Sequence, residues 1–456
     1  MKRTLLSALL FITLSSVMAD DLDPAQKANR ETVAKELDAR KAMFQADSRK
    51  LVLPGLLADA DARTIELAVE ATGISKNAIV EFFLIGEGSG HDYESLFTSL
   101  ATAKDLDAAL KFVGMKPGRN AFAMPLSFWP RGERVRAALK LADGSERALE
   151  SMVFDKGVET AGSTLPETGF VYCGSGESRI EKGQLAADFD GPCSILSTYN
   201  EPTTLLDVPR RASQNEVYEQ FLANPDASMK KFSLHRLVLR PEARATEQGP
   251  RVRDFAYTIG ADGNGGLTFQ EANAVDAAPM PLGDTAKLVE KLKAFAKDHD
   301  AFVTLDWTDA VPCGAAADFA KLLSVIDAED CIRVEAPKDG QLYYRAFLPQ
   351  TEWRDRAERP TQPCELRFAK AEDGTFAATL VTIQEIWPED GESLKPELKA
   401  TETPVPSVEA FPGLAAANEI PALLVFAPAD ATLGQVMPYV RAVQATKPNV
   451  YIFVEK

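Results

Sequence analysis

The chain has 456 residues, of which 45% are hydrophobic and 26% are charged, a composition that is ordinary for globular proteins and sufficient for large buried cores. Its formal net charge of −17 disfavours nucleic acid and anionic membrane surfaces as partners, because both are bound through Lys and Arg side chains. At about 150 residues per domain, this length predicts roughly three domains.

The N-terminus has the pattern of a secretory signal peptide at residues 1–19. Lys2 and Arg3 form a short basic region, Leu5–Leu14 is mostly apolar, and small residues precede a cleavage site before Asp20. The apolar stretch is far shorter than the roughly 20 residues that span a bilayer, and charges interrupt every later apolar run. We therefore expect a periplasmic or secreted protein with no integral membrane segment after cleavage. An uncleaved N-terminal anchor is the alternative.

A charged helix is predicted in the segment 20–47. Asp23 can cap its N-terminus, and Pro24 suits the first helical position. Val33 and Leu37 belong to a sparse apolar stripe on an otherwise polar helix. The helix is therefore expected either to lie against the next domain or to extend as a spacer.

Residues 48–228 are predicted to form a β-rich domain. Runs rich in β-branched and aromatic residues alternate with turn residues, and Val135–Leu141 and Glu146–Phe154 flank an Asp-Gly turn typical of a hairpin. A helix is predicted at Lys104–Val113, where Gly114 suits the left-handed conformation that ends many helices.

A series of motifs in this domain carries a family resemblance. In chain order they are Leu53-Pro54-Gly55, Ile65–Val69, His91–Leu96, Asp105–Leu110 and Lys116-Pro117-Gly118. With these motifs, residues from about 48 to 227 resemble the YdjY-type domain of bacterial exported proteins. The resemblance implies an exported β-rich domain and no particular activity. Some relatives are described as ferredoxin-like, but this chain lacks a clustered set of four cysteines, so we expect no iron–sulfur cluster.

The C-terminal half follows one plan twice, at residues 229–339 and 340–456. Each copy opens on a strand, His235–Leu239 in the first and Tyr344–Leu348 in the second, continues through a hairpin and closes with a strand–helix–strand unit. The offset of roughly 110–120 residues exceeds the ~20–50 residues of solenoid repeats and indicates a duplicated domain.

The closing strand–helix–strand units carry a second resemblance. The matching segments are Phe302–Asp306, Val311–Gly314 and Cys331–Glu335 in the first copy, and Leu423–Phe426, Ala429–Gly434 and Val450–Glu455 in the second. Each copy is similar to the extracytoplasmic domain of the ExbD/TolR family. The resemblance implies partner binding, to peptidoglycan or protein, and dimerisation, so the two copies are expected to pair within the chain as a pseudo-dimer. The family's transmembrane helix has no counterpart here, so proton-driven energy transduction is not implied.

The five cysteines are an odd number for an exported chain, in which disulfides form. Cys173 and Cys193 flank a predicted hairpin and are the candidate disulfide pair. Cys313 and Cys331 bracket a predicted helix roughly 16 Å long, whereas bridged Cα atoms lie within about 7 Å. We therefore do not expect these two to pair with each other, but either could pair with Cys364. No spacing of cysteines and histidines predicts a metal site.

His91, Asp92 and Glu94 form the densest polar group of the sequence. They could bind a metal or perform acid–base catalysis, and His91 and Glu94 are the candidate residues, although no catalytic residue is assigned. On a strand, alternation would place His91 on the face opposite Asp92 and Glu94, unless His91 lies in the turn. The favoured interpretation is a structural role for Glu94, such as accepting hydrogen bonds from the backbone.

Two glycine-rich loops suggest ligand sites but lack essential features. Gly86–Gly90 lacks the Gly-Lys-Ser/Thr ending of a phosphate-binding loop and leads into a predicted strand. In the loop that begins at Asp262, Glu271 comes too early for a calcium loop, whose glutamate stands at about the twelfth position. We interpret both loops as hairpin turns.

The predicted fold class is α+β, with a β-rich N-terminal domain and then two repeated small α/β domains, each closing with a strand–helix–strand unit. The predicted function is non-enzymatic binding or scaffolding of an envelope component, protein or peptidoglycan, without a cofactor and without nucleic acid. The first alternative is a metal-binding or hydrolytic enzyme centred on His91–Glu94. The second is a stalk module displayed on the cell surface.

Overall fold

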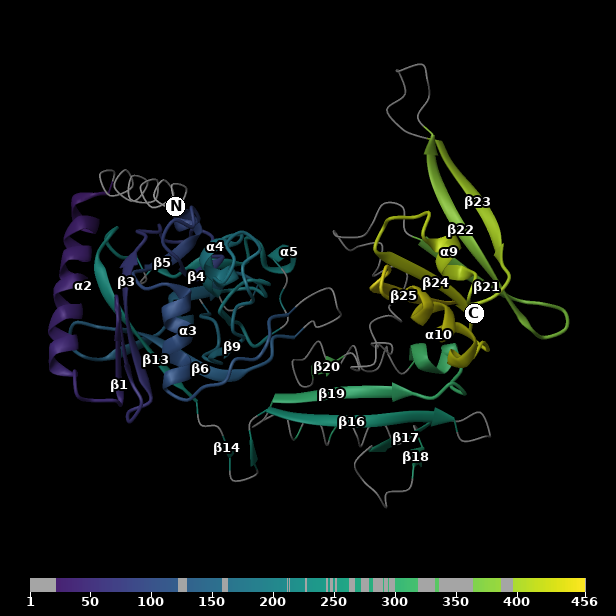
Figure 1. Cartoon of the computed structure of the whole chain (residues 1–456), viewed down its shortest axis with the longest axis horizontal. Helices are drawn as coiled ribbons and strands as arrows, with labels where there is room; N and C mark the ends of the chain where they lie inside the picture. Colours follow the sequence, from purple (N-terminus) through teal and green to yellow (C-terminus); the bar gives the residue numbers. More distant parts are fainter. Residues whose placement is uncertain are drawn as a thin grey trace, which may run out of the picture. The chain divides into compact units, whose positions relative to one another are not determined.

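The computed structural model has two compact units, Met1–Ala121 with Pro130–Arg244 and Phe122–Trp129 with Ala245–Lys456 (Figure 1). The described residues are 22–121, 129–157, 163–210, 212, 214–225, 228–242, 245–246, 249–250, 252–261, 267–271, 279–281, 290, 294, 300–318, 333–335, 364–386 and 397–455. Within this part of the chain, no helix has both the length and the apolar character needed to cross a lipid bilayer.

The first unit contains strands, α-helices and two short 3₁₀ helices. Its strands are β1 (Lys50–Leu53), β2 (Leu56–Asp59), β3 (Thr64–Ala71), β4 (Phe82–Ile85), β5 (Ser95–Ser99), β6 (Glu133–Lys140), β7 (Glu146–Ala148), β8 (Val153–Asp155), β9 (Phe170–Tyr172), β10 (Ser194–Ser197), β11 (Leu206–Asp207), β12 (Phe221–Ala223) and β13 (Leu234–Pro241). Its helices are α2 (Pro24–Met43), α3 (Ala103–Phe112), α4 (Ala186–Phe189), α5 (Gln214–Val217), η1 (Asp92–Glu94) and η2 (Glu150–Met152).

Eight of these strands close into a barrel, in the order β3-β13-β6-β9-β11-β10-β4-β5 and back to β3. Strands β1 and β2 extend the sheet beyond β3, and β7 pairs with β6. Large apolar side chains fill the interior; for example, the buried Phe83 and Phe170 rings meet edge to face at 5.3 Å. The barrel thereby buries the apolar faces of strands that lie far apart in the sequence.

Strand β13 changes the predicted boundary between the first and second domains. The segment His235–Leu239, predicted to open the first C-terminal repeat, lies inside β13 and pairs antiparallel with both β3 and β6. Because β13 joins these two strands, the barrel needs it to close. The first unit therefore extends to Arg244, beyond the predicted end at residue 228.

Helix α2 lies inside the segment predicted to be helical, along the outside of the barrel beside β1, β3 and β13 (Figure 1). Asp23 caps its N-terminus in a capping box with Gln26, and Pro24 occupies the first turn. Val33 is the buried residue of the helix. Apolar packing is therefore sparse, and polar contacts must contribute much of the docking.

The second unit contains two five-stranded sheets with the orders β18-β17-β16-β19-β20 and β23-β22-β21-β24-β25. Strand directions also correspond, because β16–β19–β20 and β21–β24–β25 are parallel while the outer pairs are antiparallel. Their bounds are β16 (Val252–Ala261), β17 (Leu267–Glu271), β18 (Met280–Pro281), β19 (Asp300–Trp307), β20 (Arg333–Glu335), β21 (Cys364–Lys370), β22 (Phe376–Ile386), β23 (Glu397–Val405), β24 (Ala422–Pro428) and β25 (Asn449–Glu455), with helices α9 (Phe411–Ala415) and α10 (Leu433–Val443) and the short pair β14 (Ala245–Thr246) and β15 (Gly249–Pro250).

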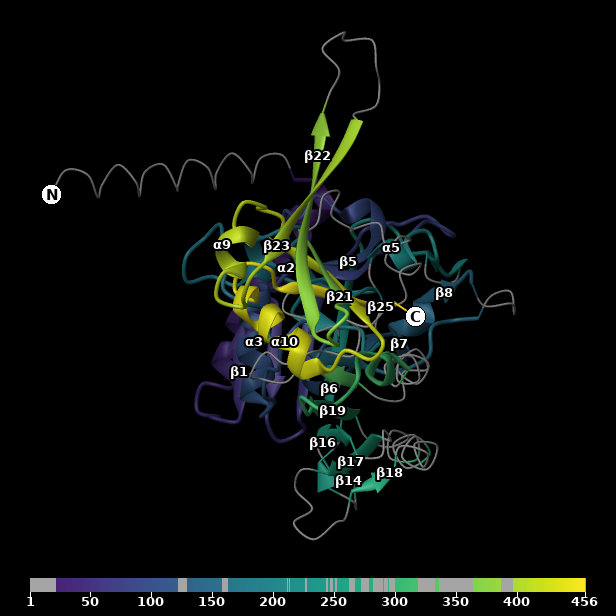
Figure 2. The same cartoon turned by 90° about the vertical axis from the view of Figure 1, so that its right-hand side faces the viewer.

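The ends of β22 and β23 continue as a two-stranded ribbon beyond β21 (Figure 2). The pairing of β21 with β22 stops at Val381, whereas β22 and β23 stay paired to Ile386 and Glu397. The predicted opening strand of the second repeat, Tyr344–Leu348, lies outside the described residues.

The two sheets meet through the loops that follow β19 and β24. The Cys313 N–H donates to the Ala431 carbonyl at 2.7 Å, and the Leu433 N–H donates to the Val311 carbonyl at 2.9 Å. A second reciprocal pair runs from Gly314 to Ala429 and from Gly434 to Asp309, both at 2.9 Å. Corresponding residues of the two loops thus exchange equivalent bonds, and one hydrophobic cluster includes side chains from both sheets.

Candidate functional site

The loop 86–94 joins β4 to β5 and borders two candidate sites of the first unit, one around His91 and Glu94 and one beside helix α2. Gly88 and Gly90 have φ values of +82° and +78°, which favour glycine, so the loop can turn sharply here. The chain then forms the 3₁₀ turn η1 before it enters β5. The predicted strand therefore begins at Ser95, after the His91–Glu94 motif.

The 3₁₀ turn brings His91 and Glu94 together, because side chains three residues apart lie on the same side of such a helix. His91 Nδ1 lies 2.6 Å from Glu94 Oε1. Glu94 is buried, whereas the His91 side chain retains 35% of its exposure. The expectation that strand alternation separates these residues is wrong for this reason, and the alternative, with His91 in the turn, is the arrangement observed.

Glu81 joins this pair and was not identified in the sequence. It is buried just before β4, and its backbone N–H donates to the Glu94 carbonyl at 2.9 Å. Glu81 Oε2 accepts from Gln214 Nε2 at 2.8 Å, while Oε1 is buried with no hydrogen-bond partner among the described residues. A charged residue within the apolar run around Phe82 was the available signal, because buried carboxyl groups are costly unless they have a role.

Burial raises the pKa of the Glu81 carboxyl, and the neighbouring Glu94 raises it further, against the opposing Gln214 hydrogen bond. The raised pKa favours the protonated form of Glu81 relative to an exposed carboxyl. A buried carboxyl with a raised pKa beside a second carboxyl group and an imidazole is chemically suited to acid–base catalysis. We call Glu81, His91 and Glu94 the acid–base cluster. Among the described residues, no group of three His, Cys, Asp or Glu side chains is placed to hold a metal ion.

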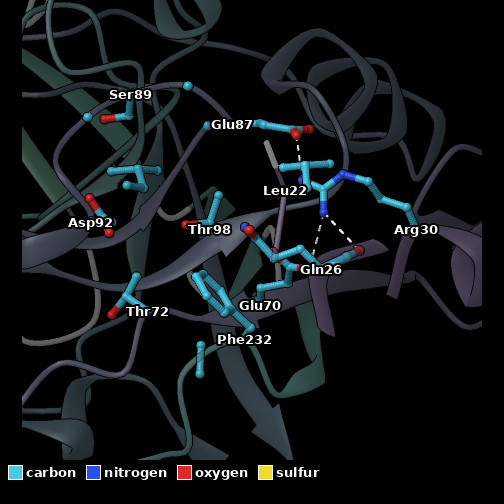
Figure 3. A pocket seen from close by; sticks show the side chains of 15 residues that line it. Leu22, Gln26, Arg30, Glu70, Thr72, Glu87, Ser89, Asp92, Thr98 and Phe232 are labelled. Atoms are coloured by element: carbon cyan, nitrogen blue, oxygen red, sulfur yellow. Dashed lines mark hydrogen bonds and ion pairs between the residues drawn. The ribbon is translucent and has the colours of Figure 1, made fainter. Parts of the chain in front are cut away.

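A cavity of about 470 Å³ lies between the N-terminal turns of α2 and the barrel (Figure 3). Its lining combines apolar side chains, hydroxyl groups and charged groups from the start of α2, from β3, β4, β5 and the loop 86–94, and from the residues before β13. These residues include Leu22, Gln26, Arg30, Glu70, Thr72, Ile85, Glu87, Ser89, Asp92, Thr98 and Phe232. We call it the α2 cavity. The glycine-rich loop Gly86–Gly90, which the sequence suggested as a ligand site and which we interpreted as a hairpin turn, lines this cavity. The sequence did not indicate the other walls, because they come from segments far apart in the chain.

Arg30 connects two walls of the α2 cavity (Figure 3). Its guanidinium donates to Glu87 Oε1 at 2.5 Å and to Glu70 Oε1 at 3.4 Å. Glu70 is only 2% exposed and also accepts from Asn29 Nδ2 at 2.8 Å and from Gln26 Nε2 at 3.4 Å. These side-chain donors to the Glu70 carboxylate all come from α2, so this helix completes the cavity and neutralises its most buried charge.

Two further ion pairs hold the C-terminal half of α2 on the barrel. Arg40 donates to Glu66 on β3, and Arg236 on β13 donates to Glu36 at 2.6 Å. Burial raises the pKa of Glu66, but the hydrogen bonds and charges of Arg40 and Lys140 together outweigh this effect and leave the pKa below its usual value. Charged side chains of α2 are thus paired with opposite charges on the adjacent strands β3 and β13.

Cys173 and Cys193, the candidate disulfide pair, are free cysteines in the structure. Cys173 follows β9 and Cys193 precedes β10, and β11 lies between these two strands. Two interstrand spacings amount to about 9.6 Å, beyond the ~7 Å that a bridge allows between Cα atoms. Cys313 and Cys364 are also free and buried, while Cys331 and the turn after Asp262 lie outside the described residues.

Comparison with known proteins supports one of the two resemblances. The family model of the YdjY domain matches residues 56–210, within the stretch of about 48–227 that resembles this domain. No curated protein matches the chain. Among solved structures, the crystal structure of prototype foamy virus protease–reverse transcriptase matches with 10% identity and a TM-score of 0.13, covering 47% of this chain and 36% of that chain. A TM-score this low carries no argument about fold or function.

Proposed function

We propose that the protein is an exported, periplasmic or secreted binding protein of the cell envelope, which holds its ligand in the α2 cavity of the YdjY domain. The cavity carries this proposal, because its volume of about 470 Å³ falls in the range of ~300–1,000 Å³ typical of ligand sites. It also combines apolar walls with a few charged groups, as such sites do. The envelope component that supplies the ligand is protein or peptidoglycan.

The C-terminal unit supplies the scaffolding part of this proposal. We infer that its two sheets are duplicated ExbD/TolR-like domains that pair within the chain as a pseudo-dimer. Their common strand order and the reciprocal hydrogen bonds between the loops after β19 and β24 support the inference. An internal pair would present two related surfaces from a single chain.

Co-sedimentation of the processed chain with purified peptidoglycan, and cross-linking to envelope proteins, test the binding function. We expect the chain to be retained by one of these components. Thr98→Phe, which places a ring in the α2 cavity, should abolish retention, whereas Thr32→Phe on the exposed face of α2 should not. Absence of retention by every component, or equal retention of both variants, would overturn the proposal.

The second candidate function is a hydrolytic enzyme at the acid–base cluster. The 2.6 Å contact between His91 and Glu94, next to a buried carboxyl with a raised pKa, favours it. The processed chain would then release soluble fragments from peptidoglycan, and Glu81→Gln would lose this activity without losing the fold. Fragment release by both proteins at equal rates, or by neither, removes this candidate.

A further inference from the structure

The charges that line the α2 cavity are unbalanced. Three carboxylates, those of Glu70, Glu87 and Asp92, face a single lining cation, Arg30. A ligand that enters the cavity therefore meets a predominantly negative lining, and the partners of each charge determine what chemistry remains available to it.

Arg30 is already committed to partners within the chain. Besides Glu70 and Glu87, its guanidinium donates to the Gln26 carbonyl at 3.0 Å. An anionic ligand could reach the guanidinium only by displacing the Glu87 carboxylate, which would then lie unpaired beside a second negative charge. This cost disfavours anions.

The N-terminus of α2 also does not favour an anionic ligand. Helix N-termini bind anions through their free N–H groups, but here the Asp23 carboxylate accepts from the Ala25 N–H at 2.8 Å. The Gln26 side chain in turn accepts from the Asp23 N–H at 3.2 Å and completes a capping box. The helix end that borders the cavity is therefore satisfied by its own side chains.

Two carboxylates remain accessible to a cation. The Glu87 side chain is 59% exposed and the Asp92 side chain is 54% exposed, and both project from the loop 86–94. Lys231 Nζ lies 3.8 Å from Asp92 Oδ2, beyond hydrogen-bond distance. A small, strongly hydrogen-bonding cation can approach the Asp92 carboxylate more closely than Lys231 does, whereas it would share the Glu87 carboxylate with Arg30, which lies 2.5 Å from Oε1.

The remaining walls of the cavity suit a short hydrocarbon. Leu22, Ile85 and Phe232 contribute apolar surface, and the hydroxyl groups of Thr72, Ser89 and Thr98 lie among them. Burial of each methylene group of a ligand against such a wall is favourable by about 0.8 kcal/mol. The apolar walls thus favour an aliphatic stem where the carboxylates favour a cation.

We propose that the α2 cavity selects small molecules in which a primary ammonium group ends a short aliphatic stem. The ammonium group pairs with Asp92, Glu87 adds a second negative charge to the lining, and the stem lies against the apolar walls. This inference rests on the proposed binding function and specifies the ligand class of the same site.

Calorimetric titration of the processed chain with three probes of matched stem tests the proposal. The probes are 1,5-diaminopentane, the neutral 1,5-pentanediol and the anionic glutarate. We expect the diamine to bind at least tenfold more tightly than the diol, glutarate not to bind, and the affinity for the diamine to fall as salt screens the accessible carboxylates. Equal or tighter binding of the diol or of glutarate would overturn the ligand class, as would failure of all three probes to bind.

Charge-neutralising variants locate the interaction. Asp92→Asn should weaken diamine binding by up to about fivefold, the factor that corresponds to an ion pair of about 1 kcal/mol between partly exposed groups, and Glu87→Gln, which removes the second charge of the lining, should weaken it by no more than that. Glu31→Gln removes the same charge from the exposed surface of α2 and should leave binding unchanged. Equal effects of the three substitutions would assign the affinity to net charge and overturn the site. Retention on envelope components is measured separately, so loss of that function with intact diamine selectivity leaves the ligand class supported.

Discussion

Gly434→Ala tests the reciprocal contact between the two sheets of the C-terminal unit. A Cβ at this position would lie 2.8 Å from the Asp309 Cβ and 3.1 Å from its carbonyl oxygen. The first distance is one that Cβ atoms essentially never show, so the loop after β19 must move away. The movement strains the hydrogen bond from the Gly434 N–H to the Asp309 carbonyl and its reciprocal counterpart from Gly314 to Ala429.

The expected change in the free energy of unfolding combines two costs and one gain. Overpacking costs about 1–3 kcal/mol, and a weakened hydrogen bond costs up to about 1 kcal/mol more. Alanine returns roughly 0.5–1 kcal/mol, because it loses less conformational entropy than glycine in a helix. We therefore expect Gly434→Ala to lower the free energy of unfolding by about 1–3 kcal/mol, which shifts the melting temperature by ~2–4 °C per kcal/mol in a unit of this size.

Urea denaturation with amide hydrogen exchange at Leu433 and Gly434 measures this effect. Gly413→Ala in α9 is the matched control, because a Cβ there meets no atom within 4 Å. It should be neutral or stabilising by up to about 1 kcal/mol. Equal midpoints for the two variants, or unchanged exchange at the Leu433 amide, would refute the reciprocal contact.

Three further predictions concern the barrel unit. Because burial raises the pKa of Glu81, the folded state holds this proton to higher pH than the unfolded chain, so stability falls as pH rises above about 4. Glu81→Gln should remove this loss and raise the free energy of unfolding by on the order of 1 kcal/mol at neutral pH. If the stability difference between the variant and the natural chain does not grow with pH, the raised pKa of Glu81 is contradicted. Gly55→Ala should cost about 1–3 kcal/mol in thermal unfolding, because Gly55 has φ +68° and a Cβ would lie 2.8 Å from the Leu100 carbonyl oxygen; an unchanged midpoint argues against this geometry. Burial raises the pKa of the Cys173 thiol well above its usual value, so Cys193 should react first with a thiol reagent; a Cys173–Cys193 peptide in a non-reducing digest would disprove the free-thiol state.

Local patterns predicted the elements whose cause is local. Asp23 and Pro24 marked the start of α2 within one residue, because capping depends on neighbouring side chains. The YdjY motifs indicated the domain that the family model matches over residues 56–210, and the strands of the structure show its β-rich character. The closure of the barrel by β13 could not be read in the same way. Its strand pattern was recognised, but the choice of β3 and β6 as partners depends on contacts across about 100–170 residues of sequence, which periodicity does not encode.

The difference between local and long-range causes also explains which parts of the candidate sites the sequence revealed. His91 and Glu94 are three residues apart, so a change from strand to 3₁₀ turn was enough to unite them. Glu81 reaches them through the backbone contact beside the parallel pairing of β4 and β5. The α2 cavity needs α2, β3, β4, β5 and the loop 86–94 at once, and Phe232 from the residues before β13. Sites assembled from so many separate segments become visible only in the folded structure.

The docking of α2 depends chiefly on one buried carboxylate. Exposed ion pairs such as Arg49–Asp61 contribute about 0–1 kcal/mol and weaken in salt. Glu70 differs because it is 2% exposed, so removing its partners would leave an uncompensated buried charge, at a cost of about 3–5 kcal/mol. Its side-chain donors Gln26, Asn29 and Arg30 all lie on α2, and two of them also line the cavity. The charge that keeps a poorly apolar helix on the barrel therefore also maintains the cavity, and moderate salt should weaken the ligand's ion pairs well before it releases the helix.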